Sequence, residues 1–189
     1  MLTNKDHTFS ICAYKESPYL EECINSVIWQ GSRVIVATST PNDFIRELCK
    51  KYDLDLFINK GETGIAGDWN FALSAAETPL VTIAHQDDIY KSNYASKMLE
   101  KMNSSDNPVI FISDYGEIRN GVEVPDSMLC KTKRILITPI RLNGKSRAMK
   151  RAALSLGNSI CCPSVTYVKS IKDKYPFAGQ MRSNLDWQM

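Results

Sequence analysis

The chain has 189 residues and a formal net charge of +2, which is enough sequence for one sizeable hydrophobic core and predicts a single domain over residues 1–189. Its longest apolar stretches, 9–14 and 79–84, are far too short to cross a bilayer, and the first ten residues lack the apolar run of a secretory signal. These features argue against a membrane-spanning or secreted protein and predict a cytoplasmic location.

The first half of the chain alternates strand and helix patterns with short connections between them. Runs of β-prone or apolar residues predict strands at 8–14, 33–38, 55–59 and 79–84. Between the strands, apolar residues three and four apart predict helices, as for Leu20, Cys23, Ile24 and Val27. Such alternation indicates βαβ units, and therefore a Rossmann-like, mostly parallel sheet with helices on both faces. Ligands of such sheets bind beyond the carboxyl ends of the strands.

The pattern changes near residue 105. A helix is predicted around 93–102 and a strand over 109–113, followed by a hairpin over 117–124 with an Asn120-Gly121 turn and a basic helix near 145–156. The predicted fold class is therefore α/β, with a small mixed C-terminal subdomain. The halves 1–105 and 106–189 are expected to share one site, since no linker-like stretch separates them.

A cationic segment occupies the last third of the chain. No acidic residue occurs from 127 to 172, whereas eight basic residues crowd into 131–151. Such a segment can attract a diphosphate, an anionic lipid head group or nucleic acid, and it can equally be a solvated helical face. We expect peripheral membrane contact, at the inner face of a membrane, as one use of this segment, and we expect no nucleic-acid partner.

Two adjacent carboxylates, Asp87 and Asp88, follow the apolar strand at 79–84. Two anionic side chains at the end of a buried strand repel one another unless positive charge lies beside them. A hydrated Mn²⁺ or Mg²⁺ ion would supply that charge, because both ions take oxygen ligands and combine protein carboxylates with substrate phosphates. The alternative is an acidic flank at a helix N-terminus, which is a common arrangement.

Several segments together resemble the family 2 glycosyltransferases, which have the GT-A fold. Their opening strand and helix are resembled by residues 8–30, which read Thr8 followed by FSICAYKESPYLEECINSVIWQ. Their Asp-x-Asp-Asp metal motif falls on His85-Gln-Asp-Asp88. Gly64, Asn70 and Ala76 also fall on family positions, and 113–115, 158–167 and 185–187 resemble three later landmarks. The resemblance covers almost the whole chain, and its ordered spacing is more specific than any single motif.

The resemblance implies inverting transfer from a nucleoside-diphosphate sugar, with a UDP-sugar favoured, to a saccharide or lipid-linked acceptor, in cell-surface or extracellular polysaccharide synthesis. Residues 1–105 would bind the donor and 106–189 the acceptor. Asp186 would be the catalytic base, and Asp87 with Asp88 would hold Mn²⁺ or Mg²⁺. The residues expected to bind the nucleotide sugar are Cys12, Ala13, Tyr14, Glu16, Ser39, Asp68, Trp69, Asn70, Gln86 and Asp87.

Some of these residues have simpler interpretations. Tyr14 could be an ordinary strand-end aromatic, Trp69 a core residue, and Asp186 a helix N-cap. His85 is interpreted as a hydrogen-bonded strand-end histidine and less readily as a metal ligand.

The chain also departs from the family pattern. His85 stands where the metal motif has its first Asp, and Trp69 stands where the family usually has Arg. Lys15 takes the place of an Asn, Leu185 takes the place of a Glu, and residues 38–39 take the place of an Asp pair. Because the chain also stops soon after Asp186, we expect a C-terminal truncation. A non-catalytic or inactive nucleotide-sugar-binding domain therefore stands as the alternative function. A sugar-phosphate nucleotidyltransferase is disfavoured, because 13–16 is no glycine-rich loop.

Overall fold

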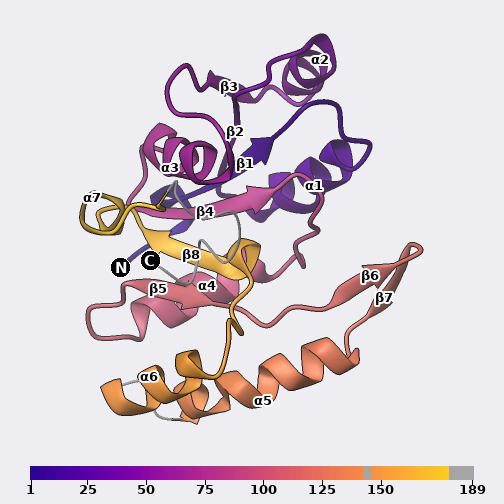
Figure 1. Ribbon diagram of the computed structural model, residues 1–189. Helices are drawn as coiled ribbons and strands as arrows, with labels where there is room; N and C mark the ends of the chain where they lie inside the picture. Colours follow the sequence, from indigo (N-terminus) through magenta and orange to yellow (C-terminus); the bar gives the residue numbers. More distant parts are fainter. Residues whose placement is uncertain (143–145, 179–189) are drawn as a thin grey trace.

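A six-stranded sheet forms the centre of the computed structural model, which describes residues 1–142 and 146–178 (Figure 1). In spatial order its strands are β3 (Asp55–Ile58), β2 (Arg33–Thr38), β1 (His7–Ala13), β4 (Leu80–His85), β8 (Val165–Val168) and β5 (Ile110–Ile112). The first four are parallel neighbours, whereas β8 runs antiparallel to both β4 and β5. The predicted α/β fold with a mostly parallel sheet is thus confirmed.

Helices cover both faces of this sheet and create two hydrophobic cores. The helices of the first half are α1 (Leu20–Val27), α2 (Asp43–Lys51), α3 (Ile65–Ala75) and α4 (Tyr94–Asn103), with short 3₁₀ turns η1 (Asn4–Asp6) and η2 (Ile28–Gln30). One core joins α1, α2 and α4 to side chains such as Phe9 and Ile11, and the other joins α3 to Ile35 and Ile83. Successive strand residues point to opposite faces, so each central strand needs apolar residues on both.

The register of the parallel strands brings four carboxyl ends to one edge. Cys12 lies opposite His85, Ala13 opposite Thr38, and Thr38 opposite Ile58. The loops that follow β1, β2, β3 and β4 therefore meet along this edge, where ligands of open α/β sheets bind. β5 runs in the same direction as β4, since both are antiparallel to β8, so Ser113 also lies at this edge.

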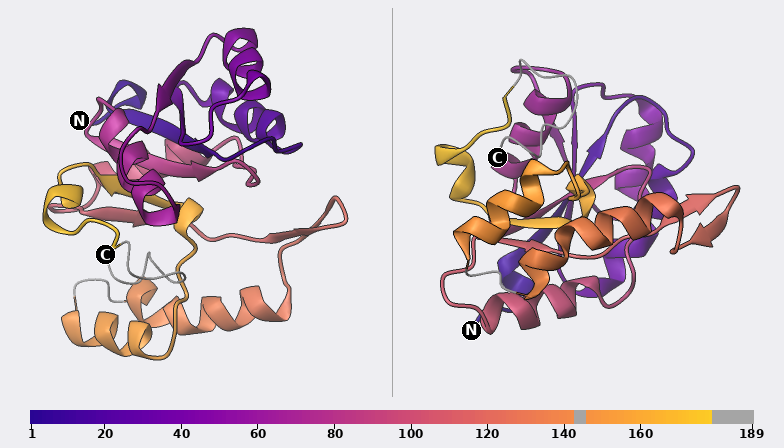
Figure 2. Two further views of the ribbon diagram at one scale, coloured as in Figure 1. Left: turned by 45° about the horizontal axis from the view of Figure 1, so that its top comes forward. Right: turned by 60° about the horizontal axis from the view of Figure 1, so that its bottom comes forward.

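The second half supplies a hairpin and a separate helical layer (Figures 1 and 2). β6 (Glu117–Arg119) pairs with β7 (Val122–Val124), and the turn between them has Asn120 at φ 51° and Gly121 at φ 76°. Both positive φ angles suit the predicted Asn-Gly hairpin turn. The remaining elements are α5 (Met128–Leu142), α6 (Arg147–Ser155), η3 (Cys162–Ser164) and α7 (Ile171–Lys174). Among the described residues, no helix combines the length and the apolar character that a bilayer crossing requires.

Candidate functional site

The loops after β1 and β4 are tied together by Gln86. Its side-chain oxygen accepts a hydrogen bond from the Tyr14 backbone N–H at 2.9 Å, and its Nε2 donates to the Tyr14 carbonyl at 3.1 Å. Lys15 has a positive φ of 55° and its N–H donates to Thr40 Oγ1 at 2.6 Å, which turns the chain sharply at the strand end. The Tyr14 ring is consequently held at the edge with 52% of its surface exposed, available for stacking.

A second polar group forms where β2, β3 and α3 meet. Asp68, in the first turn of α3, accepts a hydrogen bond from Ser39 Oγ at 2.9 Å and another from Asn59 Nδ2 at 2.9 Å. Asn59 is 6% exposed and its Nδ2 also donates to the Glu62 carbonyl. The start of α3 approaches this loop so closely that a Cβ on Gly67 would lie 2.3 Å from the Glu62 carbonyl oxygen, which requires glycine.

His85, Asp87 and Asp88 gather at the carboxyl end of β4. One ligand atom from each lies within 4.8 Å of the others, and His85 Nδ1 is 3.7 Å from Asp88 Oδ2. The other ring nitrogen, His85 Nε2, is buried without a hydrogen-bond partner. A buried polar atom without a partner is costly, and no protein group of the described chain satisfies this nitrogen. The group fits a divalent cation, and its imidazole nitrogen favours a transition metal such as Mn²⁺ over Mg²⁺.

Burial also sets the protonation of this group. Burial, together with the neighbouring charge of Asp87, raises the pKa of Asp88 to about 6. Burial lowers the pKa of His85 to about 4, against the opposing effect of Asp87. His85 is therefore neutral at physiological pH, which is the protonation state of imidazole that binds metals. The Asp88 carboxyl is ionised above pH 6 and then carries an incompletely compensated charge.

Trp69 and Asn70 hold the site from the side of α3. The Trp69 ring stacks on His85 with centroids 5.0 Å apart and planes inclined by 22°, and it also meets the edge of Phe177. Asn70 donates from Nδ2 to the Phe177 carbonyl and accepts from the Phe177 N–H, both at 2.9 Å. Both polar ends of the Asn70 side chain are thus hydrogen-bonded to backbone, and Trp69 packs against one face of the His85 ring.

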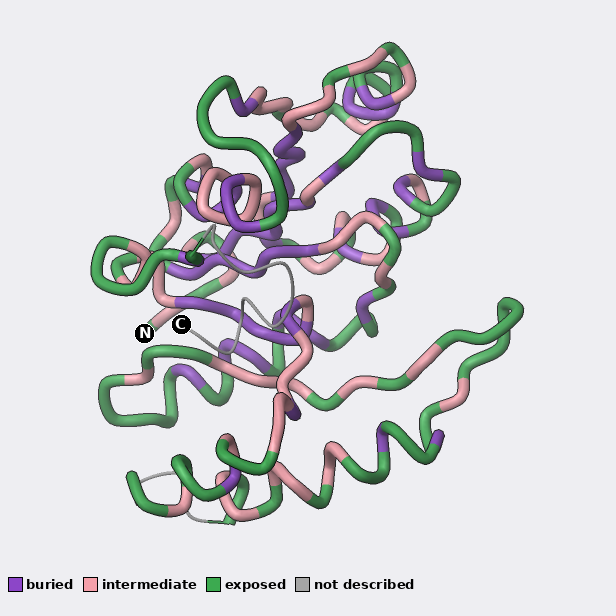
Figure 3. The backbone as a smooth tube through the Cα atoms, viewed as in Figure 1, coloured by how far each residue is buried: buried purple, intermediate pink, exposed green. Residues whose placement is uncertain are grey.

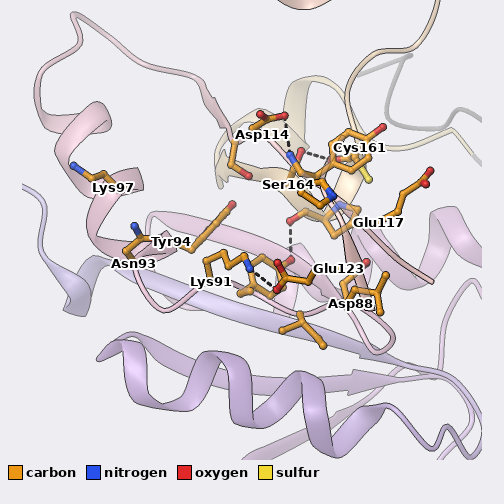
Figure 4. A pocket seen from close by; sticks show the side chains of 18 of the residues that line it. Asp88, Lys91, Asn93, Tyr94, Lys97, Asp114, Glu117, Glu123, Cys161 and Ser164 are labelled. Carbon is orange, nitrogen blue, oxygen red and sulfur yellow. Dashed lines mark hydrogen bonds and ion pairs between the residues drawn. The ribbon is translucent and has the colours of Figure 1, made fainter. Parts of the chain in front are cut away.

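A cavity of about 650 Å³ opens beside Asp87 and Asp88 on the side of β5 (Figure 4). Its walls come from the start of α4, the end of β5, the β6–β7 hairpin, the chain before β8, and Arg134 of α5. The cations at its rim are already paired: Lys91 with Glu123, Lys97 with Glu100, and Arg134 with Asp114 and Asp126. The two carboxylates at the end of β4 consequently lie between this cavity and the strand ends of β1 to β3.

The residues predicted from the sequence do not all gather at one point. The largest group lies at the ends of β1 and β4 and consists of Cys12, Ala13, Tyr14, Gln86, Asp87 and Asp88. Ser39 and Asp68 form a separate hydrogen-bonded pair. Glu16 is exposed on the loop after β1. Asn70 points its amide at Phe177. Asp186 lies outside the described residues. The sequence reasoning missed Asn59, a polar residue directly after β3 at the same edge. The interpretation of His85 as a hydrogen-bonded histidine is wrong for Nε2, which is buried without a hydrogen-bond partner among the described residues.

Comparison with known proteins gives one family. Residues 8–162 match the family model described as "Glycosyl transferase family 2". A comparison with curated protein sequences found no significant match.

Solved structures of low sequence identity share the fold. TarS 1–349 from S. aureus has a TM-score of 0.63 and 19% identity over 96% of this chain and 53% of its own. Glucosyl-3-phosphoglycerate synthase from Mycobacterium tuberculosis, in complex with UDP, has a TM-score of 0.63 and 13% identity over 92% of this chain and 60% of its own. The mannosyltransferase PcManGT from Pyrobaculum calidifontis, in complex with GDP-Man and Mn²⁺, has a TM-score of 0.60 and 16% identity over 90% of this chain and 47% of its own. The chain thus spans 47% to 60% of the length of these structures.

Proposed function

The chain belongs to glycosyl transferase family 2, and on that premise we propose that it transfers a sugar, a hexose in the first instance, from a nucleoside-diphosphate sugar to a hydroxyl acceptor with inversion. The observation that carries the proposal is the convergence of His85, Asp87 and Asp88 at the end of β4. This group lies between the polar edge formed by β1 to β3 and a cavity of about 650 Å³. A donor and an acceptor would each have one side of it.

The three residues would hold Mn²⁺ or Mg²⁺, with Mn²⁺ favoured by the imidazole. The bound cation would supply Lewis-acid stabilisation of the leaving diphosphate. The side chains contribute the rest: Asp87 and Asp88 provide the negative charge that attracts the ion, and burial keeps His85 neutral so that a lone pair is available. The Mn²⁺ complex of PcManGT, a protein of the same fold, is consistent with this choice.

The donor would lie over the ends of β1 and β2. The exposed Tyr14 ring can stack on a nucleobase, and Gln86 fixes the backbone that carries this ring. Lys15 Nζ lies 5.1 Å from the centre of the same ring and supplies positive charge beside the proposed donor site. Asp68 is oriented by Ser39 and Asn59 and retains lone pairs that can accept hydrogen bonds from sugar or ribose hydroxyls. A UDP-sugar is the donor that we propose to test first.

The acceptor would enter the cavity on the β5 side. Because its rim cations are already paired with carboxylates, the cavity suits a hydroxyl-rich saccharide better than a phosphorylated small molecule. Attack from this side reaches the anomeric carbon from the face opposite the leaving nucleotide, which gives inversion. In this proposal the proton of the attacking hydroxyl passes to Asp186. A saccharide, free or lipid-linked, in polysaccharide synthesis remains the proposed acceptor class.

The test is a binding titration of UDP with and without Mn²⁺, followed by thermal denaturation, on the parent, Asp87→Ala and Glu47→Ala. Glu47 is an exposed carboxylate of α2 that makes no ion pair within the described chain, so it controls for loss of charge alone. We expect Mn²⁺ to raise the melting temperature with UDP in the parent and in Glu47→Ala, because a ligand that binds only the native state stabilises it. In Asp87→Ala the Mn²⁺-dependent affinity should fall by about tenfold or more.

Equal Mn²⁺-dependent binding in the parent and Asp87→Ala would remove the metal assignment. Slow Mn²⁺-dependent hydrolysis of a UDP-sugar by the parent would support the enzyme, and Asp186→Asn should then keep UDP binding while losing hydrolysis. Metal-dependent binding without any turnover by the parent would instead favour the non-catalytic nucleotide-sugar-binding domain.

A further inference from the structure

α5 and α6 form a helical pair at the end of the molecule beyond the β5 edge of the sheet (Figures 1 and 2). The pair is poorly buried: within the described parts of the two helices, only Cys130 of α5 and Ala153 of α6 are buried (Figure 3). A helix in a folded domain normally hides an apolar stripe against a core. This pair leaves several large apolar side chains exposed in the described chain.

The uncovered apolar surface of α5 is ordered. Met128, Ile135 and Leu142 are 81%, 72% and 79% exposed and follow one another at intervals of seven residues. Seven residues make almost two full turns, so these three side chains share one side of the helix. Leu156, just after α6, is 72% exposed as well. Isolated exposed apolar residues need no explanation, but an aligned row of large ones indicates a binding surface.

Unpaired positive charge accompanies this row. Five cations on the two helices have no ion pair within 1–142 and 146–178: Lys131, Arg141, Arg147, Lys150 and Arg151. No acidic residue occurs between 127 and 172 that could neutralise them locally. Arg134, by contrast, turns inward to Asp114 and Asp126. All five cations are exposed, so the solvent-accessible charge on the described parts of the two helices is positive.

We propose that α5 and α6 dock on an anionic lipid bilayer, with the Met128–Ile135–Leu142 row in the interfacial layer and the five cations against the head groups. Amphipathic helices that combine a large apolar row with Lys and Arg bind membrane interfaces in this way. Each cation near an anionic leaflet contributes about fivefold to the affinity, which corresponds to about 1 kcal/mol. A nucleic acid would use the positive charge but would leave the apolar row in water.

The docking has a consequence for the cavity. Arg134 belongs to the same helix and lines the cavity beside Asp88, so a docked α5 would hold the cavity mouth close to the lipid surface. If the proposed transfer holds, an acceptor carried on a lipid would reach the cavity without leaving the membrane. The docking itself does not depend on the transfer and is tested without a substrate.

The experiment is co-sedimentation of the chain with vesicles of phosphatidylcholine alone or with about 30% phosphatidylglycerol, at low and high salt. Three variants are compared with the parent: Ile135→Asp, the pair Lys150→Gln and Arg151→Gln, and a matched pair Arg46→Gln and Lys50→Gln on α2, which lies at the opposite end of the molecule (Figure 1). All five positions are exposed, and circular dichroism with thermal melting verifies that each variant is folded.

We expect binding to the anionic vesicles only, weakened by salt because exposed charges are screened. The double substitution Lys150→Gln and Arg151→Gln should weaken binding to the anionic vesicles by about 25-fold, and Ile135→Asp should weaken it by about tenfold or more. The double substitution on α2 should change this binding by less than about twofold. Absence of binding to anionic vesicles at low salt would overturn the proposal. A loss of binding in the α2 double variant equal to that in the Lys150 and Arg151 double variant would overturn it as well. Loss with the cation pair but none with Ile135→Asp would also overturn it and would point to nucleic acid or another polyanion.

Discussion

His7 is a buried histidine whose protonation should control the stability of the fold in acid. The side chain is 0% exposed, and its Nδ1 and Nε2 lie 2.9 Å and 2.8 Å from Ser32 Oγ and Thr82 Oγ1. Both hydroxyls can donate or accept, so the neutral ring is satisfied in either tautomer. Neither partner carries charge that could offset an imidazolium. Burial therefore lowers the pKa of His7 to about 3, from an ordinary value of 6.5.

The sign and size of the effect follow from these two values. Between pH 6.5 and 3 the unfolded chain binds a proton at His7 that the folded chain does not, so the free energy of unfolding falls as the pH falls through this window. Each pH unit costs about 1.4 kcal/mol. Between pH 7.5 and 4.5 the folded state should lose about 3 kcal/mol through this one residue, which is a large part of the 5–15 kcal/mol typical of a domain.

The assay is urea unfolding at pH 7.5 and 4.5 on the parent and on His7→Asn, which cannot titrate in this range. The variant should start less stable but should lose about 3 kcal/mol less than the parent between the two pH values. Other titrating groups, including His85 and Asp88, are common to both proteins, so their contributions cancel in this difference. NMR of the parent supplies a direct measurement, because the chain has only two histidines. Equal losses in the two proteins, or a His7 ring that titrates near pH 6.5, would refute the reasoning.

Two further predictions concern the support of the site. Asn70→Ala should lower the free energy of unfolding by about 2–3 kcal/mol in urea titrations, because it removes two hydrogen bonds to the Phe177 backbone; an unchanged stability would show that this contact is dispensable. Trp69→Arg and His85→Asp should each destabilise the chain, whereas the double variant should recover about 1–2 kcal/mol relative to the sum of the two. Strict additivity in that double-mutant cycle would mean that the stacked contact between the two rings has no energetic weight.

The alternating half of the chain could be predicted because its local patterns and its tertiary environment agree. The second strand is observed over Arg33–Thr38 as predicted, and no end of the other strands in this half differs by more than one residue. The Asn120-Gly121 turn is equally local, because both residues tolerate the positive φ that the turn needs. The helix α5 was not predicted, since Pro139 lies inside it and its apolar residues do not face a core.

The sheet order and the site geometry required the structure. β8 enters between β4 and β5 although more than fifty residues separate it from β5 along the chain, and no local pattern specifies such a partner. The carboxylates at 87 and 88 could be found from the sequence because a strand ends there. The partners of Asp68 could not, because Ser39 and Asn59 meet it only through the register of β2 and β3.

Two departures from the family pattern at the proposed metal-binding group touch one another. The family pattern has Arg where this chain has Trp69 and Asp where it has His85, and here the two rings are stacked 5.0 Å apart. An Arg at position 69 together with an Asp at position 85 would place opposite charges at these two neighbouring positions, and changing only one of them would leave the other charge uncompensated. With Trp69 and His85 both positions are neutral, and an imidazole donor atom remains at the strand end. The contact between Trp69 and His85 therefore favours interpreting the two departures as one coupled substitution, which is compatible with the proposed metal-binding group.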